Sequence, residues 1–362
     1  MPTRVVIAAG GTAGHVVPAL AVADELRADG VEVVFLGGER AEAEAVPAAG
    51  YELYPLRVEG MSRRNPFKAA RALFRAARAT RRARRLLREL RPDAVVGGGG
   101  YVAGPVGLAA ALERIPLVLT EADSRLGLSN RLLAPFARRV CLAFPIPERT
   151  GDRFRVTGRP ISPPATDRRA ARARFDLGPK DVCVLVFGGS LGARSLNQAA
   201  LTAFADVDFR VLHAAGRRDY EALAPHVPGP HYDLRPYIDR FGEALLASDL
   251  VVARAGGSVF EIAAAGRPAV LVPYPHATGD HQTTNARWMA DAGAAVVIAD
   301  DELLPMRLRE TVLELLDDPE RLADMREASE TLARPAAARA VAAQVVAAAQ
   351  RAPRGAARAA AG

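Results

Sequence analysis

The sequence of 362 residues predicts an α/β protein with two Rossmann-like domains, each a doubly wound parallel sheet, that face a central cleft. Two glycine-rich turns about half the chain apart carry this prediction, at residues 10–15 (GGTAGH) and 188–194 (GGSLGAR). Each turn follows a short apolar run and leads into a helical pattern. A strand, a glycine turn and a helix in succession present free backbone N–H groups to an anion. Either turn alone would equally suit plain packing of a helix on a strand, so it is the pair that indicates two such domains.

The other elements follow in order along the chain. Apolar, strand-like runs are expected at residues 4–8, 31–36, 94–96, 117–119 and 140–143 in the first half, and at 182–187, 209–214, 250–253, 269–272 and 295–298 in the second. Helical patterns follow the two glycine turns at 18–29 and 195–204. Near-continuous apolar strands separated by helices are typical of parallel sheets that helices cover on both faces. Ligands of such sheets bind at the carboxyl ends of the strands, where both turns lie.

A proline-rich segment at residues 158–164 (GRPISPP) marks the expected domain boundary, because prolines this dense cannot continue a helix or a central strand. We therefore expect a first domain at residues 1–160 and a second at residues 164–335. The alanine-rich residues 336–351 are predicted to form a final helix that packs back on the first domain. Residues 353–362 are predicted to be a disordered tail.

Composition excludes several classes of protein. Cys141 and Cys183 each lie inside an apolar strand-like run, without the spacing of a metal site or a disulfide framework. No Asp-x-Asp pair follows a predicted strand, so neither a metal nor another cofactor is expected. The first residues lead straight into a strand rather than a signal peptide, and no run of about 18 uncharged apolar residues could span a membrane. We therefore expect a cytosolic protein.

A third glycine turn, Gly256-Gly257-Ser258, opens a short alanine-rich helix that starts at Val259. The N-terminus of such a helix suits a phosphate group. Glu261 in the first turn has two interpretations: it complements the helix dipole, or its two oxygens bind both hydroxyls of a ribose. The polar residues 273–286 (PYPHATGDHQTTNA) come directly after an apolar strand and are expected to form a loop at a ligand cleft.

Taken together, these motifs resemble the MurG family, peptidoglycan glycosyltransferases of the two-domain GT-B class. The matching segments are residues 10–23, 97–110, 127–131, 157–160, 188–197 and 253–286, in the family's order. The resemblance implies a metal-independent, inverting transfer of GlcNAc from UDP-GlcNAc to the C4 hydroxyl of MurNAc in the undecaprenyl-linked acceptor lipid I, which gives lipid II. It also implies a role in cell-wall biogenesis, cell shape and cell division.

The resemblance also implies which residues form the site. The expected donor-binding residues are Thr12, Ala13, Gly14, Ser190, Ile238 (through its backbone), Ser258, Val259, Glu261 and Gln282. Gly100 and Tyr101 lie in the turn that the family associates with the acceptor. His15 is our candidate general base, because a neutral imidazole titrates near working pH. Asp123 is the alternative base, and a structural or phosphate-contacting role for His15 stays open.

The sequence departs from the family pattern in three places: at residues 120–123, at residues 157–162, and in the loop from Arg254 to Glu261, which is one residue shorter than usual. Asp123, in Thr120-Glu121-Ala122-Asp123, stands where the family has a neutral Asn. Arg159 and Ser162 stand where the family has Asn and a phosphate-facing Arg, so Arg159 is expected to take over that contact. We therefore add Asp123, Arg159 and Ser162 to the expected donor contacts.

The net charge of +7 is concentrated in residues 63–91, which hold twelve Lys or Arg and one acid. At helical spacing, an apolar stripe is formed by Phe67, Ala70, Phe74 and Ala77, with Leu73 beside it. A basic stripe runs beside it, formed by Lys68, Arg71, Arg75, Arg78, Arg82 and Arg85. Aromatic residues flanked by arginines favour a helix that lies on anionic lipid, and the competing interpretations are nucleic-acid binding and a solvated face. A lipid-linked acceptor favours the first, so we expect a peripheral protein on the cytoplasmic face of the cell membrane, with no nucleic-acid partner. Other proteins of cell-wall synthesis and division are further candidate partners.

Three other functions compete with this one. A non-hydrolysing UDP-GlcNAc 2-epimerase shares the architecture but needs no membrane surface. A natural-product glycosyltransferase would fit the second domain but not the turn at residues 97–110. A non-enzymatic membrane-binding protein would leave the three glycine turns unexplained.

Overall fold

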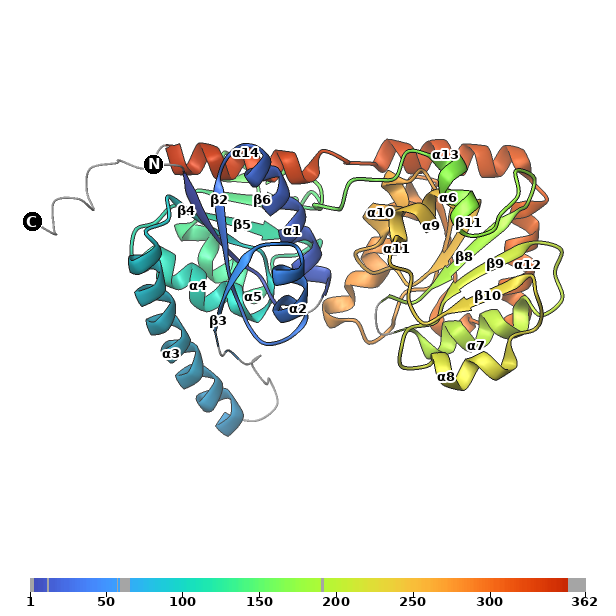
Figure 1. Cartoon of the computed structure of the whole chain (residues 1–362), viewed down its shortest axis with the longest axis horizontal. Coiled ribbons are helices and arrows are strands. Elements are labelled where there is room, and N and C mark those ends of the chain that lie inside the picture. The colour runs from blue at the N-terminus through green and yellow to red at the C-terminus, as the bar shows by residue number, and fades with distance from the viewer. Residues whose placement is uncertain (1–2, 12, 57, 59–65, 190–191, 351–362) are drawn as a thin grey trace, which may run out of the picture. The chain divides into compact units, whose positions relative to one another are not determined.

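The computed structural model describes residues 3–11, 13–56, 58, 66–189 and 192–350, without the side chains of residues 13, 66–73 and 278. The chain forms two compact units (Figure 1). Unit 1 comprises Met1–Ser162 and Ala336–Gly362, and unit 2 comprises Pro163–Pro335. The chain therefore passes between the units twice, once before Pro163 and once before Ala336.

Within the described part of unit 1, seven parallel strands form one sheet in the order β3-β2-β1-β4-β5-β6-β7. Their bounds are β1 (Arg4–Ala8), β2 (Glu32–Gly37), β3 (Glu52–Pro55), β4 (Ala94–Gly97), β5 (Leu117–Glu121), β6 (Arg139–Leu142) and β7 (Phe154–Val156). In register, Ile7 of β1 lies between Phe35 of β2 and Val96 of β4. The strand order reverses between β1 and β4, and such switch points open a crevice outside the carboxyl ends of the strands.

Unit 2 repeats this plan with six strands among its described residues, in the order β10-β9-β8-β11-β12-β13. The bounds are β8 (Cys183–Phe187), β9 (Arg210–Ala214), β10 (Tyr232–Arg235), β11 (Leu250–Ala253), β12 (Ala269–Leu271) and β13 (Ala295–Val297). Its order reverses between β8 and β11. The predicted fold class, two doubly wound parallel sheets, is confirmed.

Helices cover both faces of each sheet, as buried parallel strands require. In unit 1 they are α1 (Ala13–Ala28), α2 (Ala41–Ala48), α3 (Pro66–Leu90), α4 (Gly100–Leu112), α5 (Leu128–Leu133), a 3₁₀ turn (Ala134–Phe136) and α14 (Ala337–Gln350). In unit 2 they are α6 (Arg168–Arg174), α7 (Arg194–Ala203), α8 (Tyr220–Leu223), α9 (Phe241–Ala247), α10 (Val259–Ala264), α11 (His281–Asp291), α12 (Pro305–Leu316) and α13 (Pro319–Leu332). Three 3₁₀ turns lie at Ala224–His226, Thr278–Asp280 and Asp300–Glu302.

The core of unit 1 has one layer on each face of its sheet. On one face, the apolar side chains of α1 pack with those of β1, β2 and α14. The helix α14 contributes Val341, Ala342 and Val345 to this layer. On the other face, α3 and α4 pack against the sheet. Arg339 fixes α14 to α1 through ion pairs to Glu25 at 2.9 Å and Asp29 at 2.7 Å.

The structure differs from the sequence prediction in two places. It contains three strands that the sequence pattern did not predict, β3, β7 and β10, and each lies at an edge of its sheet. An edge strand faces water along one side, so it can lack the continuous apolar run that marks a central strand, as these three do; the fourth edge strand, β13, is apolar and was predicted. The first helix begins at Ala13 rather than at residue 18, and Pro18 lies inside it.

None of the helices among the described residues is both long and apolar enough to cross a bilayer. The same residues contain no group of three His, Cys, Asp or Glu side chains placed to hold a metal ion.

Candidate functional site

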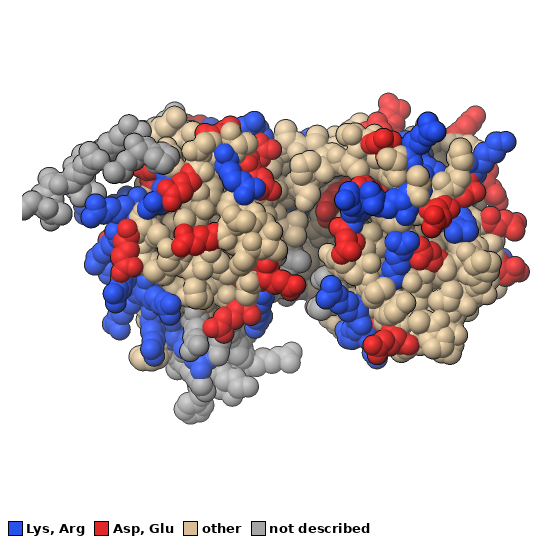
Figure 2. Space-filling view, viewed as in Figure 1, with Lys and Arg blue, Asp and Glu red and all other residues tan. Residues whose placement is uncertain are grey.

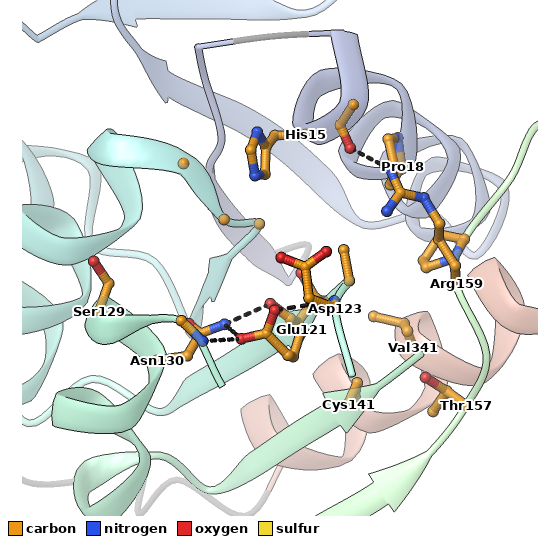
Figure 3. A pocket seen from close by; sticks show the side chains of 18 of the residues that line it. His15, Pro18, Glu121, Asp123, Ser129, Asn130, Cys141, Thr157, Arg159 and Val341 are labelled. Carbon is orange, nitrogen blue, oxygen red and sulfur yellow. Dashed lines mark hydrogen bonds between the residues drawn. The ribbon is translucent and has the colours of Figure 1, made fainter. Parts of the chain in front are cut away.

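A cavity of about 190 Å³ opens in unit 1 at the switch point between β1 and β4 (Figure 3). Segments that follow the carboxyl ends of the strands provide most of its wall. They include Gly14–His15, Gly98–Gly100, Thr120–Asp123, Gly127–Asn130 and Thr157–Pro160, and Val341 of α14 adds to them. The expected site residues Gly14, His15, Gly100, Asp123 and Arg159 all line this cavity.

His15 comes from the first turn of α1, and its ring packs against Gly99. Gly99 has a φ of +88°, and a Cβ added there would lie 2.7 Å from His15 Cδ2. The turn that follows β4 therefore provides a side-chain-free wall for the imidazole. The pKa of His15 is lowered by burial and next by the charge of Arg159, against the opposing charges of Asp123 and Glu42. The imidazole is thus neutral near pH 7 and able to accept a proton.

Two opposite charges share the cavity with His15. Figure 3 shows the Asp123 carboxylate pointing into the space beside the His15 ring and the Arg159 guanidinium. Arg159 Nη2 donates a hydrogen bond to the backbone carbonyl of Gly14 at 2.6 Å. Arg159 therefore holds the start of α1 and places a positive charge at the N-terminal end of that helix.

Glu121 organises the loop that carries Asp123. Its carboxylate is 7% exposed and accepts hydrogen bonds from Gly127 N at 2.7 Å, Asn130 Nδ2 at 3.0 Å and Asp123 N at 3.2 Å. Burial raises the pKa of Glu121 against the lowering effect of these bonds. Asn130 Nδ2 also donates to the carbonyl of Thr120 at 2.9 Å. Glu121 and Asn130 lie within the matching sequence motifs but were not predicted as site residues.

The first glycine turn differs from the anion cradle that the sequence suggested. Gly11 N–H donates to Glu42 Oε2 at 2.8 Å, so this N–H binds a carboxylate of the protein itself. Tyr101 Oη also donates to Glu42, at 3.0 Å, and burial together with that bond raises the pKa of Tyr101 to about 12. Gly100 lines the cavity, whereas the hydroxyl of Tyr101 is directed to Glu42. Sequence analysis missed Glu42.

In unit 2 the corresponding turn follows β8. Gly189 and Gly192 have φ values of +90° and +75°, and a Cβ on Gly192 would collide with the carbonyl oxygen of Ala215. Beneath it, Asn197 of α7 donates to that carbonyl at 2.8 Å and contacts His213 Nε2 at 3.1 Å. His213 Nδ1 in turn lies 2.7 Å from Tyr232 Oη. Burial lowers the pKa of His213 to about 3, so this buried network is neutral.

The other expected donor residues of unit 2 lie on several elements. The side chains of Val259 and Ile238 are buried, so only their backbone groups can face a ligand. Ser258 is the N-cap residue of α10, and Glu261 lies in the first turn of that helix. Gln282 Oε1 accepts a hydrogen bond from Tyr274 N at 2.9 Å.

Arg254, which follows β11, connects four segments at the carboxyl end of the unit 2 sheet and was missed by sequence analysis. Its guanidinium donates to the carbonyls of Val272 at 3.1 Å and Pro273 at 3.2 Å. Arg254 Nη2 lies 2.6 Å from Ser195 Oγ and 2.6 Å from Asp300 Oδ1. A buried guanidinium with this many acceptors fixes the loops around the switch point of this sheet. The signal in the sequence was an Arg between an apolar strand and the glycine turn at residues 256–258.

Several expected site residues are outside the description. Thr12 and Ser190 lie among the residues that are not described, as do the side chains of Ala13, Phe67, Lys68, Arg71 and Leu73. Ser162 is exposed at the end of unit 1.

On α3, Phe74 is 68% exposed and Arg78 is exposed as well. Lys and Arg side chains gather over this helix in Figure 2.

Comparison with known proteins defines the class to which this fold and site belong. The N-terminal domain model of glycosyltransferase family 28 matches residues 5–142, and the C-terminal domain model of that family matches residues 183–342. The protein is therefore a two-domain glycosyltransferase of family 28.

Individual relatives define the family more narrowly. A Moorella thermoacetica protein named UDP-N-acetylglucosamine–N-acetylmuramyl-(pentapeptide) pyrophosphoryl-undecaprenol N-acetylglucosamine transferase is 43% identical, over 93% of this chain and 97% of its own. The crystal structure of Acinetobacter baumannii MurG superposes with a TM-score of 0.77 and 32% identity, over 96% of this chain and all of that one. The chain belongs to the MurG family. A Listeria monocytogenes structure titled putative UDP-N-acetylglucosamine 2-epimerase, with a TM-score of 0.70 and 16% identity over 95% of this chain and 96% of its own, shares the fold alone.

Proposed function

We propose that the protein transfers GlcNAc from UDP-GlcNAc to lipid I and so makes lipid II for peptidoglycan synthesis. The observation that carries this proposal is the 43% identity, over nearly the whole chain, to the Moorella thermoacetica transferase, whose name states the donor, the acceptor and the transferred sugar. The cavity of unit 1 supports it, because a neutral imidazole beside a glycine wall can accept a proton from a sugar hydroxyl.

In the proposed reaction, the C4 hydroxyl oxygen of MurNAc attacks the anomeric carbon of GlcNAc while the bond from that carbon to the β-phosphate oxygen breaks. Attack from the face opposite UDP inverts the α linkage to β. The hydroxyl proton passes to His15, whose lowered pKa keeps the ring neutral near pH 7. Asp123 is the alternative base, since its carboxylate faces the same cavity.

Donor recognition is proposed for residues of unit 2. We assign the ribose hydroxyls to Glu261, uracil to the backbone of Ile238, and a phosphate to the N-terminus of α10 at Ser258 and Val259. Gln282 would bind a hydroxyl of the sugar. The buried side chains of Ile238 and Val259 favour backbone contacts, and the N-terminus of α10 favours an anion. In unit 1, Gly14 and Arg159 would stabilise the growing charge of the leaving diphosphate.

We also propose that the protein is peripheral to the cytoplasmic face of the cell membrane and that α3 contacts anionic lipid. The exposed Phe74 beside exposed arginines supports this assignment. Each basic residue near an anionic surface contributes about 1 kcal/mol, so the arginines of α3 would together give firm but salt-sensitive binding. Proteins of cell-wall synthesis and division are proposed as further partners.

Release of UDP, measured with lipid I, with a soluble aglycone and with neither, tests the proposed function. We expect release from UDP-GlcNAc with lipid I only, together with a lipid II product. Release with the soluble aglycone alone would favour a natural-product glycosyltransferase. Formation of UDP-ManNAc without any acceptor would favour an epimerase.

A further inference from the structure

Glu42 is a fully buried carboxylate that joins three separate segments of unit 1. It lies in the first turn of α2 and accepts hydrogen bonds from Gly11 N at 2.8 Å, Gly38 N at 2.8 Å and Tyr101 Oη at 3.0 Å. Gly11 follows β1, Gly38 follows β2, and Tyr101 follows β4. These are the strands on both sides of the switch point, so a single side chain ties together the ends of its strands.

The neighbouring glycines leave room for this carboxylate. A Cβ on Gly10 would lie 2.6 Å from Glu42 Oε1, and a Cβ on Gly38 would lie 2.7 Å from the same atom. A Cβ on Gly11 would lie 3.1 Å from Cε1 of the Tyr101 ring. The glycines that follow β1 and β2 therefore leave space for two side chains of the protein itself, Glu42 and Tyr101.

The two turns that Glu42 joins also hold His15. The glycine segment after β1 leads into α1, and His15 lies at the start of that helix. The turn after β4 contains Gly99, which packs against the His15 ring. A Cβ on Gly100, in the same turn, would collide with the carbonyl oxygen of Gly10. Through Gly11 and Tyr101, Glu42 therefore connects the segment that bears the imidazole of His15 with the segment that packs against that ring.

Glu42 also acts on His15 through its charge. Burial alone would raise the pKa of Glu42, but the hydrogen bonds from Gly11, its own N–H, Tyr101 and Gly38 outweigh burial and lower that pKa. The carboxylate is thus ionised near pH 7. The charged groups that act on His15 are Arg159, which lowers its pKa, and Asp123 and Glu42, which raise it.

We propose that Glu42 is a positioning residue for sugar transfer. Its carboxylate ties Gly11, ahead of the helix that bears His15, to Tyr101 in the turn at residues 98–101, and so sets the position of His15 without touching a substrate. The proposal rests on the proposed function insofar as His15 accepts the proton of the acceptor hydroxyl. Glu42 would thus hold the proposed base in place, a role distinct from that of the residues proposed to contact the substrates.

The variant Glu42→Gln tests this proposal, because it keeps the size of the side chain but removes one acceptor oxygen and the charge. Its single oxygen cannot accept from both Gly11 and Gly38. We expect kcat to fall about 10²-fold, the effect of a misplacement near 1 Å, while KM for UDP-GlcNAc changes less than about twofold. Amide hydrogen exchange should rise at Gly11 or Gly38, and the pKa of His15 measured by NMR should fall.

Glu44→Gln is the matched control, because Glu44 is an exposed carboxylate on the same helix. It removes the same charge and should leave kcat, amide exchange and the pKa of His15 unchanged. Should Glu42→Gln fail to fold, Glu42→Asp keeps the charge and shortens the reach. We then expect a loss in kcat of about tenfold or more with a smaller change in the pKa of His15.

A folded Glu42→Gln protein with unchanged kcat and unchanged amide exchange would overturn the proposal, as would an unchanged kcat in Glu42→Asp. Equal effects of Glu42→Gln and Glu44→Gln would overturn it too. Failure of the proposed function is separate, since the wild-type protein would then release no UDP with lipid I. In that case the exchange and NMR measurements still decide whether Glu42 positions His15.

Discussion

The imidazole of His15 lies so close to Gly99 that a methyl group on that glycine would come within 2.7 Å of His15 Cδ2. The imidazole and its glycine wall come from different crossovers of the unit 1 sheet, one after β1 and the other after β4. The position of the imidazole therefore depends on the absence of a side chain at residue 99, and this dependence can be tested.

Gly99→Ala should displace His15 and strain the backbone, since φ at this position is +88°. We expect kcat to fall about 10²-fold and the free energy of unfolding to fall by about 1 kcal/mol or more. Gly30→Ala is the control, because Gly30 has a φ of +75° with nothing within 4 Å of the added Cβ. If both variants lose stability but neither loses kcat, the His15 contact has no role in catalysis.

The pH dependence of kcat/KM should follow His15 in a definite direction. Because the pKa of His15 is lowered below 6.5, activity should persist at pH 6.5, where an unshifted histidine would be half protonated, and should fall at lower pH. Arg159→Gln removes a positive charge, so the acidic limb should move to higher pH. Asp123→Asn removes a negative charge and should move it to lower pH.

His15→Ala should lower kcat by about 10²–10⁴-fold and remove that acidic limb. Parallel pH–rate profiles of His15→Ala and Asp123→Asn assign the base. A nearly silent His15→Ala beside a severely impaired Asp123→Asn would exchange the two roles.

Glu261→Ala should weaken UDP-GlcNAc binding by about 1.5–3 kcal/mol, the usual loss for a hydrogen bond to a charged group. Isothermal titration measures the effect directly. Glu314→Ala, an exposed position on α12, should leave affinity unchanged. Unchanged affinity in Glu261→Ala would mean that this carboxylate only complements the dipole of α10.

Replacement of Arg71, Arg75 and Arg78 by glutamate should abolish co-sedimentation with anionic vesicles, because attraction becomes repulsion. Wild-type binding should weaken as salt rises, since charges are screened beyond about 8–10 Å. Replacement of Phe67 and Phe74 by serine should weaken vesicle binding by removing the apolar side chains, while the salt dependence that comes from the arginines remains. Both variants should keep UDP binding and activity on a short-chain acceptor while losing activity on lipid I in vesicles. Equal losses on both acceptors would indicate a folding or acceptor-site role for α3, and binding of nucleic acid instead of vesicles would favour the competing interpretation.

His213 should make stability depend on pH. The folded pKa is about 3 and the unfolded value 6.5, so the unfolded state binds more protons between these values. Stability is therefore complete above about pH 6.5 and should fall by about 1.4 kcal/mol per pH unit as the solution becomes more acidic. Urea unfolding of the wild type and of His213→Gln between pH 7 and pH 5 tests this, and the variant should show a shallower slope.

The central elements of both sheets could be predicted because their strands are continuous apolar runs and glycine turns follow them. Three of the four edge strands could not, since a strand such as β3 (Glu52–Pro55) has polar residues and exposed ends, whereas the apolar edge strand β13 (Ala295–Val297) was predicted. Glu42 and Glu44 show the limit most clearly. They lie two positions apart in a run of alanine and glutamate, yet one is fully buried and the other is exposed. Only the packing of α2 against the glycine turns distinguishes them.

The helix α14 closes the hydrophobic core of unit 1 from the far end of the chain, and Val341 also lines the cavity. During synthesis, the ribosome must therefore complete unit 2 before unit 1 can bury the faces of β1 and α1. A fragment that stops at residue 162 would expose those apolar surfaces and aggregate. To isolate the first unit, residues 336–350 would have to be joined to residue 162 by a linker in place of residues 163–335.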